Sequence, residues 1–107
     1  MDYNLKVVSV FNLAKEIIDK YVEQDNILSF VIGKTDSIEN RQLDERYEGY
    51  KLHEIAEDSP DIINRLEKSL ILLFNVDELY SDLHEKQNEG GQGNENANKL
   101  YIAIKTK

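Results

Sequence analysis

Apolar residues follow helical spacing in the first part of the chain and extended spacing just after it. Between Val10 and Val22 they recur every three or four positions, which predicts an amphipathic helix within residues 1–26. The following segment, Ile27–Ile32, is short, apolar on both faces and closed by Gly33. It therefore predicts a strand buried on both sides. We expect this strand to be central, pairing with the segment around Leu52 and with Leu100–Ile104 or lying between helices, and to be covered by the helix from Ser59 to Phe74.

A second helix is predicted after Gly33. Asp36 can cap its first turn, and Glu39 three positions later completes a capping-box pattern. This helix is expected over residues 37–47. The segment Tyr50–Glu57 alternates imperfectly between apolar and polar residues and is interpreted as a second strand.

Ser59-Pro60 is the clearest helix start in the chain, with serine at the capping position and proline at the first helical position. An apolar stripe extends this third helix to about Phe74. The spacing of three apolar residues after it favours a shorter fourth helix from about Asp77 to Lys86.

Residues 87–98 include three glycines and four asparagines but no large apolar side chain. Such a long connection in a small domain is typical of a functional or mobile loop. Leu100–Ile104 then predicts the last strand. The whole order predicts one α/β (α+β) domain over residues 1–107, with a small three-stranded, mostly antiparallel sheet flanked by helices.

Composition narrows the function classes. The 107 residues carry 13 basic and 21 acidic side chains, a net charge of −8, without a basic run. This composition argues against tight, sequence-independent nucleic-acid binding over the whole surface. The chain has no cysteine, so thiol catalysis and cysteine-zinc sites are excluded. The N-terminus lacks a secretory pattern and the apolar runs are short, so we expect a cytoplasmic protein without a membrane partner.

Two charged residues stand out as candidates for chemistry. Glu67 has apolar neighbours at positions i−4, i−1, i+3 and i+4 of its helix: Ile63, Leu66, Leu70 and Ile71. Its carboxylate either turns into the core, where it needs a cation or strong donors, or reaches water at the edge of the stripe. Arg41 lies one turn into the second predicted helix. It either pairs with Glu45 four positions later, which periodicity favours, or binds a phosphate.

Four features in order resemble the GIY-YIG nuclease superfamily. Phe30–Thr35, FVIGKT, is similar to the strand that ends in YIGKT, and Arg41 stands eight residues after Gly33. Glu67 matches the family's glutamate on an apolar helix. Residues 88–93, NEGGQG, are similar to a glycine-rich turn before the last strand. The resemblance spans about residues 27–104 and implies the same small sheet with helices.

The resemblance implies roles for these residues. Glu67 would hold one Mg²⁺ or Mn²⁺, and Arg41 would stabilise the charge on the reacting phosphate. Gly33, Lys34, Thr35 and Asn88 would border the cleft or bind phosphate.

One departure affects the proposed chemistry. Val31 stands where the family has a tyrosine that helps to activate water, and valine carries no ionisable proton. Tyr47, Tyr50 and Tyr101 are the residues that could replace it, and we include Tyr47 among the catalytic candidates.

Two classes of function follow. The first is a divalent-metal-dependent DNA endonuclease, or a divergent relative whose activity and DNA binding are weak without a partner. The second is a nuclease fold that has lost catalysis and binds a protein, for example a phage-encoded acidic inhibitor of a host nucleic-acid enzyme. Retained Arg41 and Glu67 favour the first class, whereas Val31 and the charge of −8 favour the second.

Overall fold

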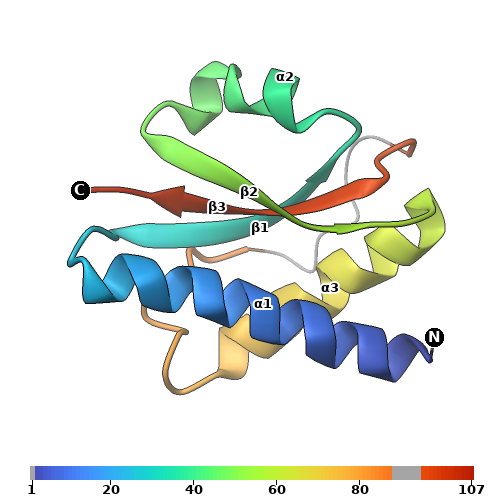
Figure 1. Cartoon of the computed structure of the whole chain (residues 1–107), viewed down its shortest axis with the longest axis horizontal. Coiled ribbons are helices and arrows are strands. Elements are labelled where there is room, and N and C mark those ends of the chain that lie inside the picture. Colours follow the sequence, from blue (N-terminus) through green and yellow to red (C-terminus); the bar gives the residue numbers. More distant parts are fainter. Residues whose placement is uncertain (1, 88–94) are drawn as a thin grey trace.

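A computed structural model describes residues 2–87 and 95–107. One antiparallel sheet lies between helices on its two faces (Figure 1). The elements in chain order are α1 (Tyr3–Glu23), β1 (Ser29–Thr35), α2 (Ile38–Gln42), the 3₁₀ helix η1 (Glu45–Tyr47), β2 (Tyr50–Glu57), α3 (Pro60–Val76) and β3 (Lys99–Lys105). The predicted α+β class with a small three-stranded sheet is confirmed.

The strand order is β1-β3-β2, and both outer strands pair antiparallel with β3. The prediction that Ile27–Ile32 is the central strand, paired with the segment around Leu52, is therefore wrong, whereas its predicted pairing with Leu100–Ile104 is confirmed. The central strand is β3, where every residue from Leu100 to Ile104 is buried. The predicted burial of Ile27–Ile32 on both sides is also wrong, because Leu28 is 53% exposed and Val31 is only half-buried, so this apolar run did not mark a central strand.

The two faces of the sheet are covered unequally. Helices α1 and α3 lie together against one face, and the short α2 and η1 lie over the other (Figure 1). The main core forms between the sheet and the α1–α3 pair. Its fully buried large side chains are Ile18, Phe30, Ile32, Ile63, Leu66, Leu70, Ile71, Phe74, Leu100, Ile102 and Ile104. Within the described ranges, no helix has the length and apolar character that a membrane crossing requires.

Helix starts follow local hydrogen bonding. As predicted, Ser59 caps α3, and its Oγ accepts a hydrogen bond from the Ile62 backbone N–H. The second predicted cap is wrong by one residue, because Ser37 rather than Asp36 caps α2. The Thr35 hydroxyl, bonded to the Ser37 backbone at 3.1 Å, holds the turn that makes Ser37 the cap.

The single helix predicted over residues 37–47 is also wrong, since α2 ends at Gln42 and η1 begins at Glu45. The Asp44 carboxylate accepts a hydrogen bond from the Arg46 backbone N–H and starts a new turn there. Leu43 is 83% exposed, so no core contact holds the chain in a continuous helix.

The fourth helix, predicted from Asp77 to Lys86, does not form; the segment is a series of turns. The Asp77 carboxylate accepts hydrogen bonds from the backbone N–H groups of Leu79 and Tyr80. Farther on, Phe30 of β1 donates its N–H to Leu83 O and accepts one from Glu85 N. These tertiary bonds use backbone groups that a helix would need, which explains why helical spacing failed here.

Each outer strand is also bound by a glutamine side chain. The Gln42 amide accepts from Leu52 N at 2.9 Å and donates to Tyr50 O at 2.8 Å on β2. The Gln87 amide accepts from Ile32 N at 2.9 Å and donates to Ile32 O at 2.8 Å on β1. Both amides thus satisfy backbone groups on the outer edges of the sheet.

Gly33 and Tyr101 face each other across β1 and β3. The Tyr101 ring lies directly over the glycine: a Cβ built on Gly33 would stand 2.3 Å from both Cζ and Oη. A side chain at position 33 therefore cannot coexist with the ring in its present place. The glycine that closes the FVIG motif is needed for this close approach, not for an unusual backbone angle.

We predict that Gly33→Ala lowers the free energy of unfolding by about 1–3 kcal/mol, because the new methyl group overlaps a buried ring. In a Tyr101→Leu background, which lacks the overlapping atoms, the same substitution should change stability by less than about 0.5 kcal/mol. Urea denaturation of the four proteins measures this coupling. Equal costs in both backgrounds would contradict the packing argument.

Candidate functional site

A pair of tyrosine hydroxyls forms the centre of the candidate site. Tyr47, at the end of η1, and Tyr101, on the central strand, share a hydrogen bond of 2.6 Å between their Oη atoms. Their rings meet edge to face at 5.8 Å between centroids. Tyr101 is only 1% exposed, so its position is fixed by the sheet below and η1 above. Of the three tyrosines considered from the sequence, these two share a hydroxyl hydrogen bond, and the Tyr50 ring packs edge to face on Tyr47 at 5.6 Å between centroids.

Tyr50, the third, has a different hydrogen-bond partner. Its hydroxyl donates to Glu85 at 2.6 Å, in the turn segment before the loop. Burial, together with this hydrogen bond to a carboxylate, raises the pKa of Tyr50 to about 12. Tyr50 therefore ties β2 to the turn segment.

Arg41 lies in the last turn of α2 and is half-buried. The ion pair with Glu45 that periodicity favoured is not formed among the described residues. The Asp44 pKa is lowered mainly by Arg46, and the Arg41 charge adds to this effect; the same charge opposes the rise of the Tyr101 pKa. The guanidinium is thus held on the η1 side of the sheet, within electrostatic range of the tyrosine pair.

Glu67 is buried on α3, at 6% exposure, which decides between the two readings of its helix position. Its Oε1 lies 3.8 Å from the Lys34 ammonium, and both side chains are almost inaccessible. Lys34 also donates a 2.6 Å hydrogen bond to Oδ1 of Asn64, one turn earlier on α3. Asn64 was not anticipated from the sequence, because its role depends on how α3 packs on β1.

These residues do not lie on one side of the sheet. Successive residues of a strand point to opposite faces, so Lys34 faces α3 whereas Gly33 and its partner Tyr101 face α2. Arg41 and Tyr47 belong to the α2 side, and Glu67 to the α3 side. Charges from both sides affect the Tyr101 phenol: Arg41 lowers its pKa and Glu67 raises it.

The Tyr101 phenol is strongly perturbed. Burial, followed by the hydrogen bond with the Tyr47 hydroxyl, raises its pKa far above the ordinary value of 10. Glu67 raises it further, and Arg41 opposes the rise. At neutral pH the phenol therefore keeps its proton and can serve only as a hydrogen-bonding group or proton donor.

The remaining candidates from the sequence have structural roles or lie outside the described residues. Thr35 is buried and its hydroxyl is used in the turn to α2. Gly33 lies beneath the Tyr101 ring. Asn88, with most of the glycine-rich segment, falls outside the described residues.

The described donor set does not fit a resident divalent cation. Glu67 supplies one carboxylate, and an ammonium lies 3.8 Å from it, so a metal ion there would meet like charge. Within residues 2–87 and 95–107, no group of three or more histidine or acidic side chains could hold a metal. A cation at Glu67 would therefore require Lys34 to move and oxygen ligands from elsewhere.

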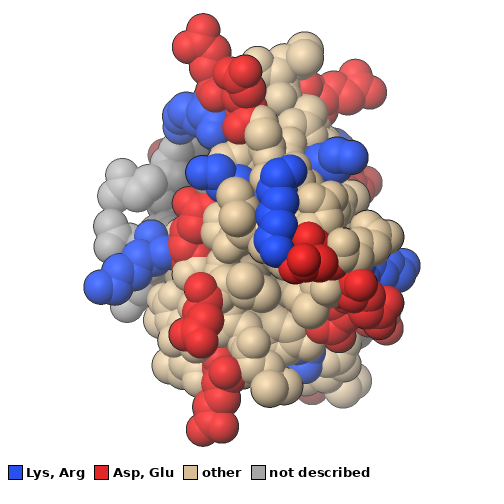
Figure 2. All heavy atoms as spheres, turned by 90° about the vertical axis from the view of Figure 1, so that its left-hand side faces the viewer, with Lys and Arg blue, Asp and Glu red and all other residues tan. Residues whose placement is uncertain are grey.

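The surface charge is mixed on the face drawn in Figure 2, which is the left-hand side of Figure 1. Lysine and arginine side chains stand among aspartates and glutamates there. That face thus forms neither a basic track for a nucleic-acid backbone nor an unbroken acidic band.

Comparison with known proteins gives no relative: the chain matches no protein-family model, no curated protein and no solved structure. The resemblance to the GIY-YIG superfamily therefore stays a prediction. Within the described residues it depends on the FVIGKT strand, Arg41 and Glu67. What the geometry adds is the tyrosine pair between them.

The raised pKa of Tyr101 predicts a loss of stability at alkaline pH. A group whose pKa is higher in the folded state stabilises the fold below its unfolded value, here about 10, and this contribution disappears as the pH rises above it. Urea denaturation at pH 8 and pH 11 should show a steeper loss for the wild type than for Tyr101→Phe. A stability difference between the two proteins that is the same at both pH values would contradict the shift.

Proposed function

We propose that the protein is a divergent, weakly active relative of the metal-dependent DNA endonucleases, with a phosphodiester bound beside Arg41 and the Tyr47–Tyr101 pair. The observation that carries this proposal is the hydrogen bond between the Tyr47 and Tyr101 hydroxyls on the side of the sheet where α2 holds Arg41. Arg41 would bind the negative charge that develops on the phosphorus centre. The tyrosine hydroxyls would orient a phosphate oxygen by hydrogen bonding.

Two features support weak rather than efficient catalysis. An efficient proton acceptor has a pKa near the working pH, whereas Tyr101 holds its proton far above that range. Mg²⁺ or Mn²⁺ would have to arrive with the DNA, because Lys34 occupies the space beside Glu67. The net charge of −8 also slows encounter with a polyanion.

Nicking of supercoiled DNA tests the proposal. We expect slow nicking with Mn²⁺ at high protein concentration, lowered about 100-fold or more by Arg41→Ala and by Glu67→Gln. Each change removes one of the two charges that act on Tyr101. The measurement is the initial rate of open-circle formation.

Matched controls separate site chemistry from general effects of charge. Arg65→Ala and Glu78→Gln make the same chemical changes at exposed positions, so both should nick at the wild-type rate. Rates that stay equal in all five proteins would point to a contaminating nuclease, and complete inactivity of the wild type would reject the enzyme proposal.

A second function, a catalytically lost fold that binds a protein partner, is favoured by the Lys34–Glu67 contact. An ammonium held beside the motif carboxylate by Asn64 neutralises the charge that a metal would need. In this reading the buried charges stabilise the packing of α3 on β1, and the partner binds elsewhere.

Lys34→Met separates the two readings. It keeps an unbranched apolar stem but removes the ammonium, so Mn²⁺ affinity of the free protein should rise about 10-fold if Glu67 retains a latent metal role. Paramagnetic broadening of amide signals near Glu67 measures this, with Lys34→Met/Glu67→Gln as the control. A folded Lys34→Met protein with unchanged Mn²⁺ affinity would favour the protein-binding function.

A further inference from the structure

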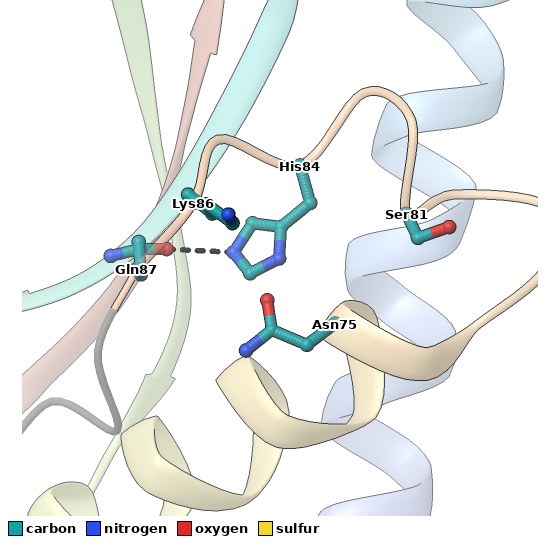
Figure 3. Close-up of a pocket in the computed structure, with 5 residues that line it drawn as sticks. All are labelled: Asn75, Ser81, His84, Lys86 and Gln87. Atoms are coloured by element: carbon teal, nitrogen blue, oxygen red, sulfur yellow. Dashed lines mark hydrogen bonds between the residues drawn. The ribbon is translucent and has the colours of Figure 1, made fainter.

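A separate pocket of about 580 Å³ lies where the turn segment after α3 meets β1 (Figure 3). Five residues line it: Asn75, Ser81, His84, Lys86 and Gln87. None of them belongs to the tyrosine and arginine cluster described above. His84 is the buried member, at 8% exposure.

The Gln87 clamp fixes which nitrogen of His84 carries the proton. Gln87 Oε1 accepts from Ile32 N and its Nε2 donates to Ile32 O, so the amide cannot be reversed. That same Oε1 lies 2.8 Å from His84 Nε2. Because a carbonyl oxygen only accepts, Nε2 must donate, and His84 Nε2 therefore carries a hydrogen.

The other ring nitrogen is left as a bare acceptor. Burial, above all, lowers the pKa of His84 below its ordinary value of 6.5, so the ring is neutral at pH 7. With Nε2 protonated, Nδ1 then presents a lone pair. This atom is buried and has no hydrogen-bond partner among the described residues. An unsatisfied buried acceptor is costly, which indicates that something outside the described chain donates to it.

Only the edge of the imidazole is available to a ligand. Phe30 stacks on the ring, with 5.1 Å between centroids and 18° between planes, and Phe74 packs against it at 6.0 Å. Since Nδ1 itself has almost no exposed surface, a ligand must displace a lining side chain and bring its donor to Nδ1 in the plane of the ring. The lining also includes Asn75, whose amide faces the ring, Lys86 on the Gln87 side of it, and Ser81, whose hydroxyl points away from the ring (Figure 3).

We propose that this pocket binds a small anion that carries its own hydroxyl donor, such as a hydrogen phosphate group or a 2-hydroxycarboxylate. The hydroxyl donates to His84 Nδ1, and the anionic oxygens accept from Lys86, Ser81 and the Asn75 amide. The hydroxyl of such an anion matches the acceptor on His84, and its negative oxygens match the ammonium of Lys86 and the polar side chains of Ser81 and Asn75.

The lining disfavours other ligand classes. A transition metal would find one imidazole nitrogen, no carboxylate and a repelling ammonium among the five lining residues. A nucleobase would find no open aromatic face, because the only ring in the lining is already covered. This proposal does not depend on the proposed nuclease function.

Paired anions test the requirement for a hydroxyl. Long-range ¹⁵N–¹H NMR of the imidazole should first show protonated Nε2 and unprotonated Nδ1 in the free protein. Inorganic phosphate and glycolate should then shift the Nδ1 resonance with saturable binding. Sulfate matches phosphate in shape and acetate resembles glycolate, but neither has a hydroxyl, so both should bind at least about 10-fold more weakly.

Variants separate this site from general attraction of anions. Lys86→Gln changes an exposed side chain and should weaken phosphate and glycolate binding about 10-fold, whereas Lys51→Gln, on exposed β2 surface, should not. His84→Phe keeps an aromatic ring but removes the acceptor and should abolish the preference for hydroxylated anions. A protonated Nδ1, no shift with phosphate and glycolate, or equal binding of sulfate and phosphate would each overturn the proposal.

Discussion

The contact between the Tyr101 ring and Gly33 is the constraint on which the candidate site depends. It places a large aromatic residue of the central strand across the backbone of β1. The ring then directs its hydroxyl to Tyr47, which fixes the position of η1 over the sheet. Because η1 follows α2 closely, the same contact also limits where Arg41 can lie. The absence of a side chain at Gly33 thus helps to set where Arg41 lies relative to β1.

Elements with strong local signals could be predicted from the sequence. Ser59-Pro60 fixed the start of α3, and β2 has the bounds expected for Tyr50–Glu57. Local chemistry also explains the errors nearby. Ser37 displaced Asp36 as a cap through bonds to Thr35, a competition between adjacent hydroxyl and carboxylate groups that spacing alone cannot rank.

Features that depend on packing between distant segments could not be predicted. Whether Glu67 was buried was undecided until α3 was placed against Lys34. Identifying Tyr101 rather than Tyr50 as the hydrogen-bond partner of Tyr47 required the register between β1 and β3, which periodicity does not give. The turns after α3 form because Phe30 bonds to the segment across the edge of β1, and a helical stripe contains no information about that partner.

The two glutamine amides have a consequence for how this protein can associate with others. Gln42 and Gln87 occupy backbone groups on the outer margins of β2 and β1, where another chain would otherwise add a strand. Partner recognition by β-augmentation is therefore blocked at these positions, and so is the edge-to-edge stacking that starts aggregation. Losing either amide would leave these backbone groups free and open that part of the sheet margin to self-association.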